Sequence, residues 1–226
     1  MAETTSDRQP TVVQLILVPS VITLALTILR LIGELQHWSP VLFNREAGGL
    51  GSLIGITWLP PIFGGFFALK LSKLGAGPSR AGRAILHSGL GLVIIVAGSA
   101  LAFILKVGYY GQLVAFCVVF AAAAAVQYPA WPRLFKTLLA YGYAARIPVA
   151  ILMYFAMRGN WGTHYDAVQP DSPPAMNEFW PKYFWLAFLP QLIAWVGFTI
   201  WIGSLFGSIA AALARRRKTG AQTAEA

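Results

Sequence analysis

Charged residues are scarce in this chain. Asp, Glu, Lys and Arg make up 11% of its 226 residues, whereas hydrophobic residues make up 57%. A soluble domain carries about 25% charged residues. So low a charge content, together with apolar runs near the length of a bilayer span, excludes an ordinary soluble domain and predicts an integral membrane protein.

Cysteine and histidine are also rare. The single Cys117 lies inside an apolar run, which excludes an intrachain disulfide and a Cys-x-x-Cys redox or zinc site. The three histidines, His37, His87 and His164, form no His-Glu-x-x-His pattern and no pair spaced by four residues. We therefore predict no metal site and no cofactor.

Acidic residues are few, so the formal net charge is +9. In a soluble protein this excess would indicate a nucleic-acid partner. Here the basic residues are dispersed between apolar runs instead of gathering on one face, as in the cytoplasmic loops of membrane proteins. The sequence thus predicts a lipid bilayer as surroundings and no nucleic acid as partner.

Apolar runs recur along the whole chain, and each is near the roughly 20 residues that cross a bilayer at about 1.5 Å per residue. They cover residues 11–34, 50–71, 84–107, 112–128, 134–157 and 183–213. The predicted fold class is an all-α integral membrane protein, a bundle of about six transmembrane helices.

Lysine and arginine between the runs predict the orientation. One set of segments holds eleven of them: Arg8, Lys70, Lys73, Arg80, Arg83, Arg133, Lys136, Arg215, Arg216, Arg217 and Lys218. The alternate segments hold four: Arg45, Lys106, Arg158 and Lys182. Since Lys and Arg concentrate in cytoplasmic loops, both termini are predicted to be cytoplasmic.

This orientation divides the chain into a cytoplasmic N-terminal tail, a membrane domain and a basic cytoplasmic C-terminal tail. These parts are residues 1–10, 11–213 and 214–226, and the outer loops lie at about 35–49, 107–111 and 158–182. The N-terminus lacks the basic region and cleavage site of a signal peptide. With loops this short, we expect the cytoplasmic (inner) membrane of a bacterium.

The predicted outer loops are aromatic and polar. The first contains His37, Trp38 and Glu46, and the last contains His164 and Asp166 among several aromatic residues. Two interpretations remain open. The aromatic residues can form the belt that membrane proteins place at the bilayer interface, or the loops can fold into a cap over a site.

Arg146 lies near the middle of the run 134–157. A charge at that depth costs about 3 kcal/mol on insertion scales, and such residues usually face the bundle interior and find a partner. No carboxylate lies at comparable depth; the neutral candidates for a partner are Gln127, Tyr141, Tyr143 and Gln191. Arg146 can instead bind backbone carbonyls freed by Pro148, or it can hold an anionic ligand.

Two further features join Arg146 as candidates. Arg30 and Glu34 are spaced by four residues, so they share one helix face near the outer end of the first span. Trp58 precedes Pro60 and Pro61, which are predicted to bend or break the second span, and broken helices expose backbone dipoles that transporters use. The candidate ligand-binding residues are Arg146, Arg30, Glu34, Gln191 and Trp58.

Three functions remain open. The leading hypothesis is a small transporter, a lipid- or anion-binding protein or an accessory membrane subunit, with an outward-facing pocket for an anionic lipid or small anion and with possible membrane-protein partners. The first alternative is a membrane-embedded enzyme acting on a lipid or isoprenoid at the outer interface. Its catalytic candidates are His164, Asp166, Glu46 and His37. The second alternative is a structural subunit of a larger membrane complex.

Overall fold

The computed structural model describes residues 10–48 and 52–224, with side chains as far as Arg216. Within these ranges the chain is helical and contains no strand. The longer helices are α1 (Val12–Leu35), α2 (Leu59–Lys73), α3 (Ala81–Ile104), α4 (Tyr109–Ala125), α5 (Pro132–Gly159) and α7 (Trp195–Ala224). Except for Pro10, the predicted N-terminal tail lies outside the described residues.

Short elements lie between the longer helices along the chain. They are η1 (Ile56–Trp58), η2 (Pro174–Asn177), α6 (Phe179–Lys182), η3 (Tyr183–Phe188) and η4 (Pro190–Ala194). The last two have π-helical geometry and join α6 to α7 in one long helical segment. π-helical turns often occur at functional sites.

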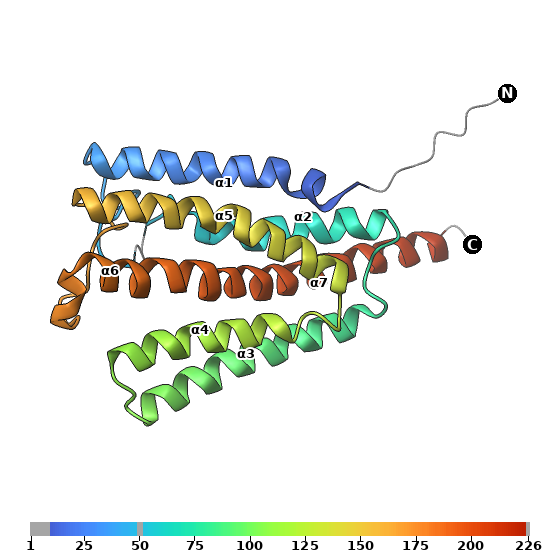
Figure 1. The fold of residues 1–226 in the computed structure, drawn as a ribbon. Helices are drawn as coiled ribbons and strands as arrows, with labels where there is room; N and C mark the ends of the chain where they lie inside the picture. Colours follow the sequence, from blue (N-terminus) through green and yellow to red (C-terminus); the bar gives the residue numbers. More distant parts are fainter. Residues whose placement is uncertain (1–9, 49–51, 225–226) are drawn as a thin grey trace.

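The helices lie side by side along their length, with α7 in the middle of the bundle (Figure 1). α7 packs against α2, α3, α4 and α5, while α1 packs on α5 and α3 pairs with α4. The connections that follow α1, α3 and α5 gather at one end, which we name the loop end (Figure 1). The start of α1 and the last turns of α7 lie at the opposite end, which we name the tail end.

The all-helical prediction is confirmed for the described residues. Among them, α1, α3, α5 and the segment Phe179–Arg216 are long and apolar enough to cross a membrane, and α4 is a shorter apolar helix. Large apolar side chains such as Leu86 and Phe103 of α3 are exposed on the outside, whereas Ser88 and Gln127 are buried. Helices surrounded by lipid distribute their side chains in this way, since apolar surface facing lipid carries no cost.

In the second predicted span, the prolines lie at the start of a helix and not in its middle. Ser52–Gly55 is not helical, η1 forms a single turn, and α2 begins at Leu59 with Pro60 and Pro61 in its first turn. Proline lacks an N–H, and the first N–H groups of a helix have no partner within it, so prolines here start a helix instead of bending one. The predicted residues 50 and 51 lie outside the described part.

The last helix also differs from the prediction. α7 continues past residue 213, through the basic run at 214–218, and ends at Ala224. Arg, Lys and Ala are favourable in helices, so nothing in this stretch stops the backbone pattern.

α2 and α7 approach each other through glycines. A Cβ on Gly64 would collide with the backbone of Gly203, and the carbonyl oxygen of Gly64 lies 2.8 Å from the place of a Cβ on Gly207. Small residues permit such close contact between helices in membranes. This contact therefore holds α2 against α7.

We expect Gly64→Ala to lower the free energy of unfolding by about 2 kcal/mol, because added volume in a packed contact forces backbone shifts. Thermal unfolding of the purified protein in mild detergent measures the change. Gly89→Ala in α3 is the matched control, since no atom lies within 4 Å of the added Cβ there. Equal melting temperatures for the two variants would contradict this account of the α2–α7 contact.

Candidate functional site

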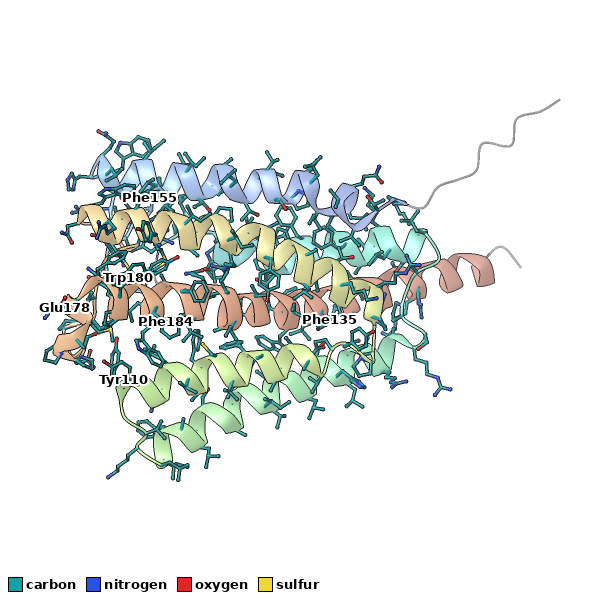
Figure 2. The ribbon with its side chains drawn as sticks, viewed as in Figure 1. Tyr110, Phe135, Phe155, Glu178, Trp180 and Phe184 are labelled. Carbon is teal, nitrogen blue, oxygen red and sulfur yellow. The ribbon has the colours of Figure 1, made fainter. Side chains whose placement is uncertain are left out.

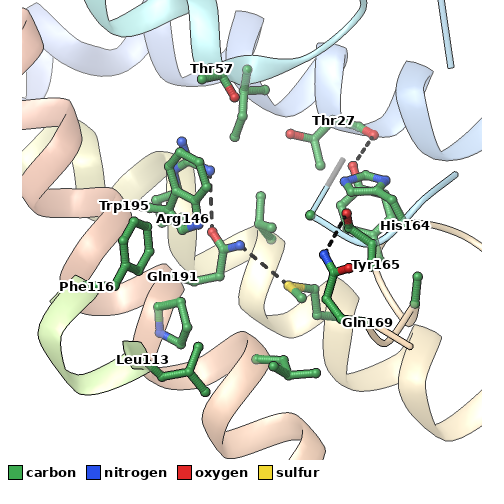
Figure 3. A pocket seen from close by; sticks show the side chains of 18 of the residues that line it. Thr27, Thr57, Leu113, Phe116, Arg146, His164, Tyr165, Gln169, Gln191 and Trp195 are labelled. Carbon is green, nitrogen blue, oxygen red and sulfur yellow. Dashed lines mark hydrogen bonds between the residues drawn. The ribbon is translucent and has the colours of Figure 1, made fainter. Parts of the chain in front are cut away.

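A cavity of about 340 Å³ lies in the half of the bundle nearer the loop end. Volumes of this size are typical of small-molecule sites. Its polar lining includes Thr27, Arg30, Arg146, His164, Gln169 and Gln191, and its apolar lining includes Leu113, Phe116, Val149, Met153, Leu186 and Trp195 (Figure 3). The cavity therefore joins residues of α1, η1, α4, α5, the 160–178 connection, η3, η4 and the start of α7.

Arg146 is the main charge in this cavity. Its side chain comes from α5, and the residue is only 4% exposed. Nη1 donates a long hydrogen bond of 3.4 Å to Gln191 Oε1, and the guanidinium carbon lies 4.7 Å from the centre of the Trp195 ring (Figure 3). Nε is buried without a hydrogen-bond partner, and no carboxylate of the described residues lies within 4 Å. A positive charge thus borders the cavity without a counter-charge.

The π-helical segment η4 places the partner of Arg146. Pro190 has no N–H to donate, so the regular helical bond is missing at this position and a wider turn is tolerated. Gln191 follows it, receives the bond from Arg146 and donates to Met153 Sδ at 3.6 Å. Among the predicted partners of Arg146, the structure selects Gln191.

The other candidate partners of Arg146 lie elsewhere. Gln127 accepts from Ser88 Oγ at 3.1 Å, and Tyr141 shares a hydrogen bond of 2.8 Å with Thr23. Tyr143 is exposed. In the described residues no backbone carbonyl accepts from Arg146, so the carbonyls near Pro148 do not hold it.

Glu34 is the second charged centre, and it lies behind the cavity wall. Its carboxylate is buried and accepts from Arg30 Nε at 2.8 Å, the pair predicted from their spacing. It also accepts from the backbone N–H of His164 at 2.9 Å. His164 Nδ1 lies 2.6 Å from Oε1 and 2.8 Å from Oε2. Glu34 therefore ties α1 to the 160–178 connection across 130 residues of sequence.

These contacts define the protonation state of His164. A carboxylate can only accept, so Nδ1 carries the proton that bonds Glu34. Burial lowers the pKa of His164 below its usual value, and the charge of Arg30 acts in the same direction, while the bond to Glu34 and the charges of Glu34 and Asp166 oppose both. His164 is then neutral near pH 7, with its Nε2 lone pair on the side of the ring away from Glu34.

Tyr165 supports the ring of His164. The two ring centres are 3.8 Å apart, and the Tyr165 hydroxyl donates a weak bond of 3.5 Å to the carbonyl of Thr27 (Figure 3). Burial raises the pKa of Tyr165, which keeps this hydroxyl protonated and neutral. The pair forms one wall of the cavity.

The lowered pKa of His164 predicts a pH dependence of stability. In the unfolded chain the imidazole takes up a proton below about pH 6.5, whereas in the folded protein it resists protonation. Unfolding is therefore favoured as the pH falls below about 6.5. Melting temperatures from about pH 8 to about pH 5 should fall more steeply for the native protein than for His164→Asn, which cannot titrate there. Parallel profiles would contradict the buried neutral state.

The remaining predicted residues do not line the cavity. Asp166 accepts from the backbone N–H groups of Gly162 and Thr163 at 2.9 and 2.8 Å and from Thr163 Oγ1 at 2.6 Å, so it closes a turn beside His164. Glu46 and His37 are exposed loop residues. Trp58 is 62% exposed on the outside of the bundle, although its neighbour Thr57 does line the cavity.

Some lining residues were missed by the sequence reasoning. Trp195 follows Gln191 by four residues, which places both on one helix face, so their spacing was an available signal. Thr27 likewise lies three residues before Arg30. Gln169 and Met153 carry no such signal, because their places depend on how the loop and α5 fold against the other helices.

Comparison of the chain with protein-family models, with curated proteins and with solved structures gives no match. The geometry of the site is thus the basis for assigning a function.

Proposed function

We propose that this protein crosses a membrane with six helices and binds an anionic ligand in the cavity beside Arg146. The single observation that carries the proposal is the buried guanidinium without a counter-charge and with an unpartnered Nε at the cavity wall. A buried polar group without a partner is costly, and a charged one more so. An anion at this position would satisfy both the charge and the donor.

Two features support the membrane orientation in this proposal. Successive long helices run in opposite directions, and of the predicted cytoplasmic residues Lys73 at the end of α2, Arg80 just before α3 and Arg133 at the start of α5 belong to segments at the tail end (Figure 1). Tyr110, Trp180 and Phe184 lie at the loop end with exposed rings, as residues at a bilayer interface do (Figure 2). The cavity then opens toward the outer side of the membrane, and both termini are cytoplasmic.

The lining also supports a ligand with two different parts. Arg146 and Gln191 offer donors to an anionic group, while Leu113, Val149 and Leu186 offer apolar surface. Mostly apolar walls with a few convergent polar groups are typical of small-molecule sites. We infer that the ligand is an amphiphilic anion, such as an anionic lipid or an alkyl acid.

A built-in probe allows this function to be tested. Trp195 lies over Arg146, so an anion bound there should change the fluorescence of Trp195. We expect octyl phosphate to change the emission of the purified protein in a saturable manner, and octylamine to have no such effect. The Trp195→Phe variant assigns the signal among the eight tryptophans. A response to octylamine equal to that to octyl phosphate would reject the anion site.

A second candidate function is a membrane-embedded enzyme acting on a lipid or isoprenoid at the outer interface. The observation that favours it is the Glu34–His164 pair, since a carboxylate that orients an imidazole through Nδ1 leaves Nε2 available as a general base. Mass spectrometry of an ester-linked anionic lipid incubated with the protein tests it. An enzyme should release product and lose this turnover in His164→Asn; intact lipid in both samples would leave binding as the function.

A further inference from the structure

The cavity presents two hydrogen-bonding groups that the described residues leave unsatisfied. The first is Arg146 Nε, a buried donor. The second is His164 Nε2, for which no hydrogen bond exists in the described part of the chain, although the residue lines the same cavity. One group can only donate and the other, in its neutral form, can only accept.

The accepting role of His164 Nε2 follows from the groups around the ring. Glu34 accepts the proton of the imidazole at Nδ1, and its Oε1 also accepts from Arg30 Nε at 2.8 Å. A second proton on the ring would bring a positive charge next to Arg30 in a buried place, which is unfavourable. On its own loop, Asp166 is engaged by the backbone N–H groups of Gly162 and Thr163 and does not contact the ring.

A plain anion satisfies only half of this cavity. Its oxygens would accept from Arg146. An anionic oxygen next to His164 Nε2, however, has no hydrogen to donate, so two lone pairs would face each other. A hydroxyl group resolves this conflict because it donates to Nε2. We infer that the ligand of this cavity is an anion that also carries a hydroxyl group, with the anionic group at Arg146 and the hydroxyl at His164 Nε2. This inference rests on the proposed function.

Two sources supply this chemistry. One is a hydroxylated alkyl acid, and the other is a phospholipid whose headgroup bears hydroxyls, such as phosphatidylglycerol. For each of them there is a comparison compound of the same charge that lacks the hydroxyl. β-Hydroxyoctanoate is compared with octanoate by the fluorescence titration, and phosphatidylglycerol is compared with phosphatidylethanol in nanodiscs.

We expect at least one hydroxylated probe to bind about tenfold more tightly than its comparison compound, since a buried acceptor left unpaired lowers affinity. The variant His164→Asn should abolish this preference, so that the two members of each pair bind with equal affinity. The Asn amide can still donate to Glu34 in place of Nδ1, but it offers no group at the position of Nε2. His37→Asn, at an exposed loop residue, is the matched control.

The outcomes separate the inference from the function on which it rests. If only β-hydroxyoctanoate binds more tightly than its comparison compound, the ligand is a free hydroxy acid. If only phosphatidylglycerol does, the ligand is a lipid headgroup. Either result supports the inference. Equal binding within both pairs overturns the inference but leaves the anion site intact. Binding of neither pair and no response to octyl phosphate overturns the proposed function as well. The wild-type comparison decides even if His164→Asn does not fold.

Discussion

Arg146→Met should weaken the binding of octyl phosphate by about 100-fold. Arg146 is the charged residue that α5 contributes to the cavity lining, and a charge-assisted hydrogen bond to the anion contributes about 1.5–3 kcal/mol. Methionine fills much of the same volume, and it removes a buried charge that no carboxylate of the described residues balances. The melting temperature without ligand should therefore stay unchanged or rise. Fluorescence titration and thermal unfolding of the same samples measure both effects.

The matched control for this prediction is Arg158→Met. Arg158 also belongs to α5, but it is exposed at the loop end and lies over the Phe179 ring. It should bind octyl phosphate like the native protein. If Arg146→Met instead lowered the melting temperature and left binding unchanged, Arg146 would serve only to hold helices together, and the proposed function would fall.

Glu34→Gln should lower the free energy of unfolding by about 3 kcal/mol or more, which is a larger loss than we expect for Gly64→Ala. The carboxylate receives Arg30, the His164 ring and the His164 backbone N–H in a buried place. A glutamine offers one accepting oxygen and a donor amide, so Arg30 loses its counter-charge and one donor faces another. Unfolding in mixed detergent measures the free-energy change.

Glu46→Gln provides the control, since Glu46 is exposed and its substitution should change stability by less than about 0.5 kcal/mol. Glu34→Gln should also speed proteolytic cleavage between residues 160 and 178, because Glu34 anchors this connection to α1. Equal stability and equal cleavage for the two variants would mean that the Arg30–Glu34–His164 contacts add nothing to the fold.

Part of the site followed from local rules. Arg30 and Glu34 meet because residues four apart share a helix face. Arg146 was expected to face the interior and to find a neutral partner, and Gln191 was among the four candidates. Which of the four it bonds could not be read from the chain, because the depth of each residue in its own helix does not give the rotation of that helix against its neighbours.

The loop residues are placed by contacts with distant segments and not by their spacing in the sequence. His164 and Asp166 were paired as catalytic candidates because they are close in sequence. In the structure Asp166 accepts hydrogen bonds within a turn, and His164 bonds Glu34 instead. An irregular loop has no fixed period, so sequence distance does not predict which of its side chains points inward. Trp58 and Thr57 illustrate the same limit: one faces outward and its neighbour lines the cavity.

What the sequence determined by itself is the helical class and, within a few residues, the extents of α1, α3, α4 and α5, because long apolar runs bounded by polar turns leave the backbone one way to satisfy its hydrogen bonds. The tertiary structure alone decided the start of α2, the contact of Glu34 with His164 and the cavity itself. These features depend on the packing of segments far apart in the chain, where the fit of side chains between helices selects one arrangement among many with the same local pattern.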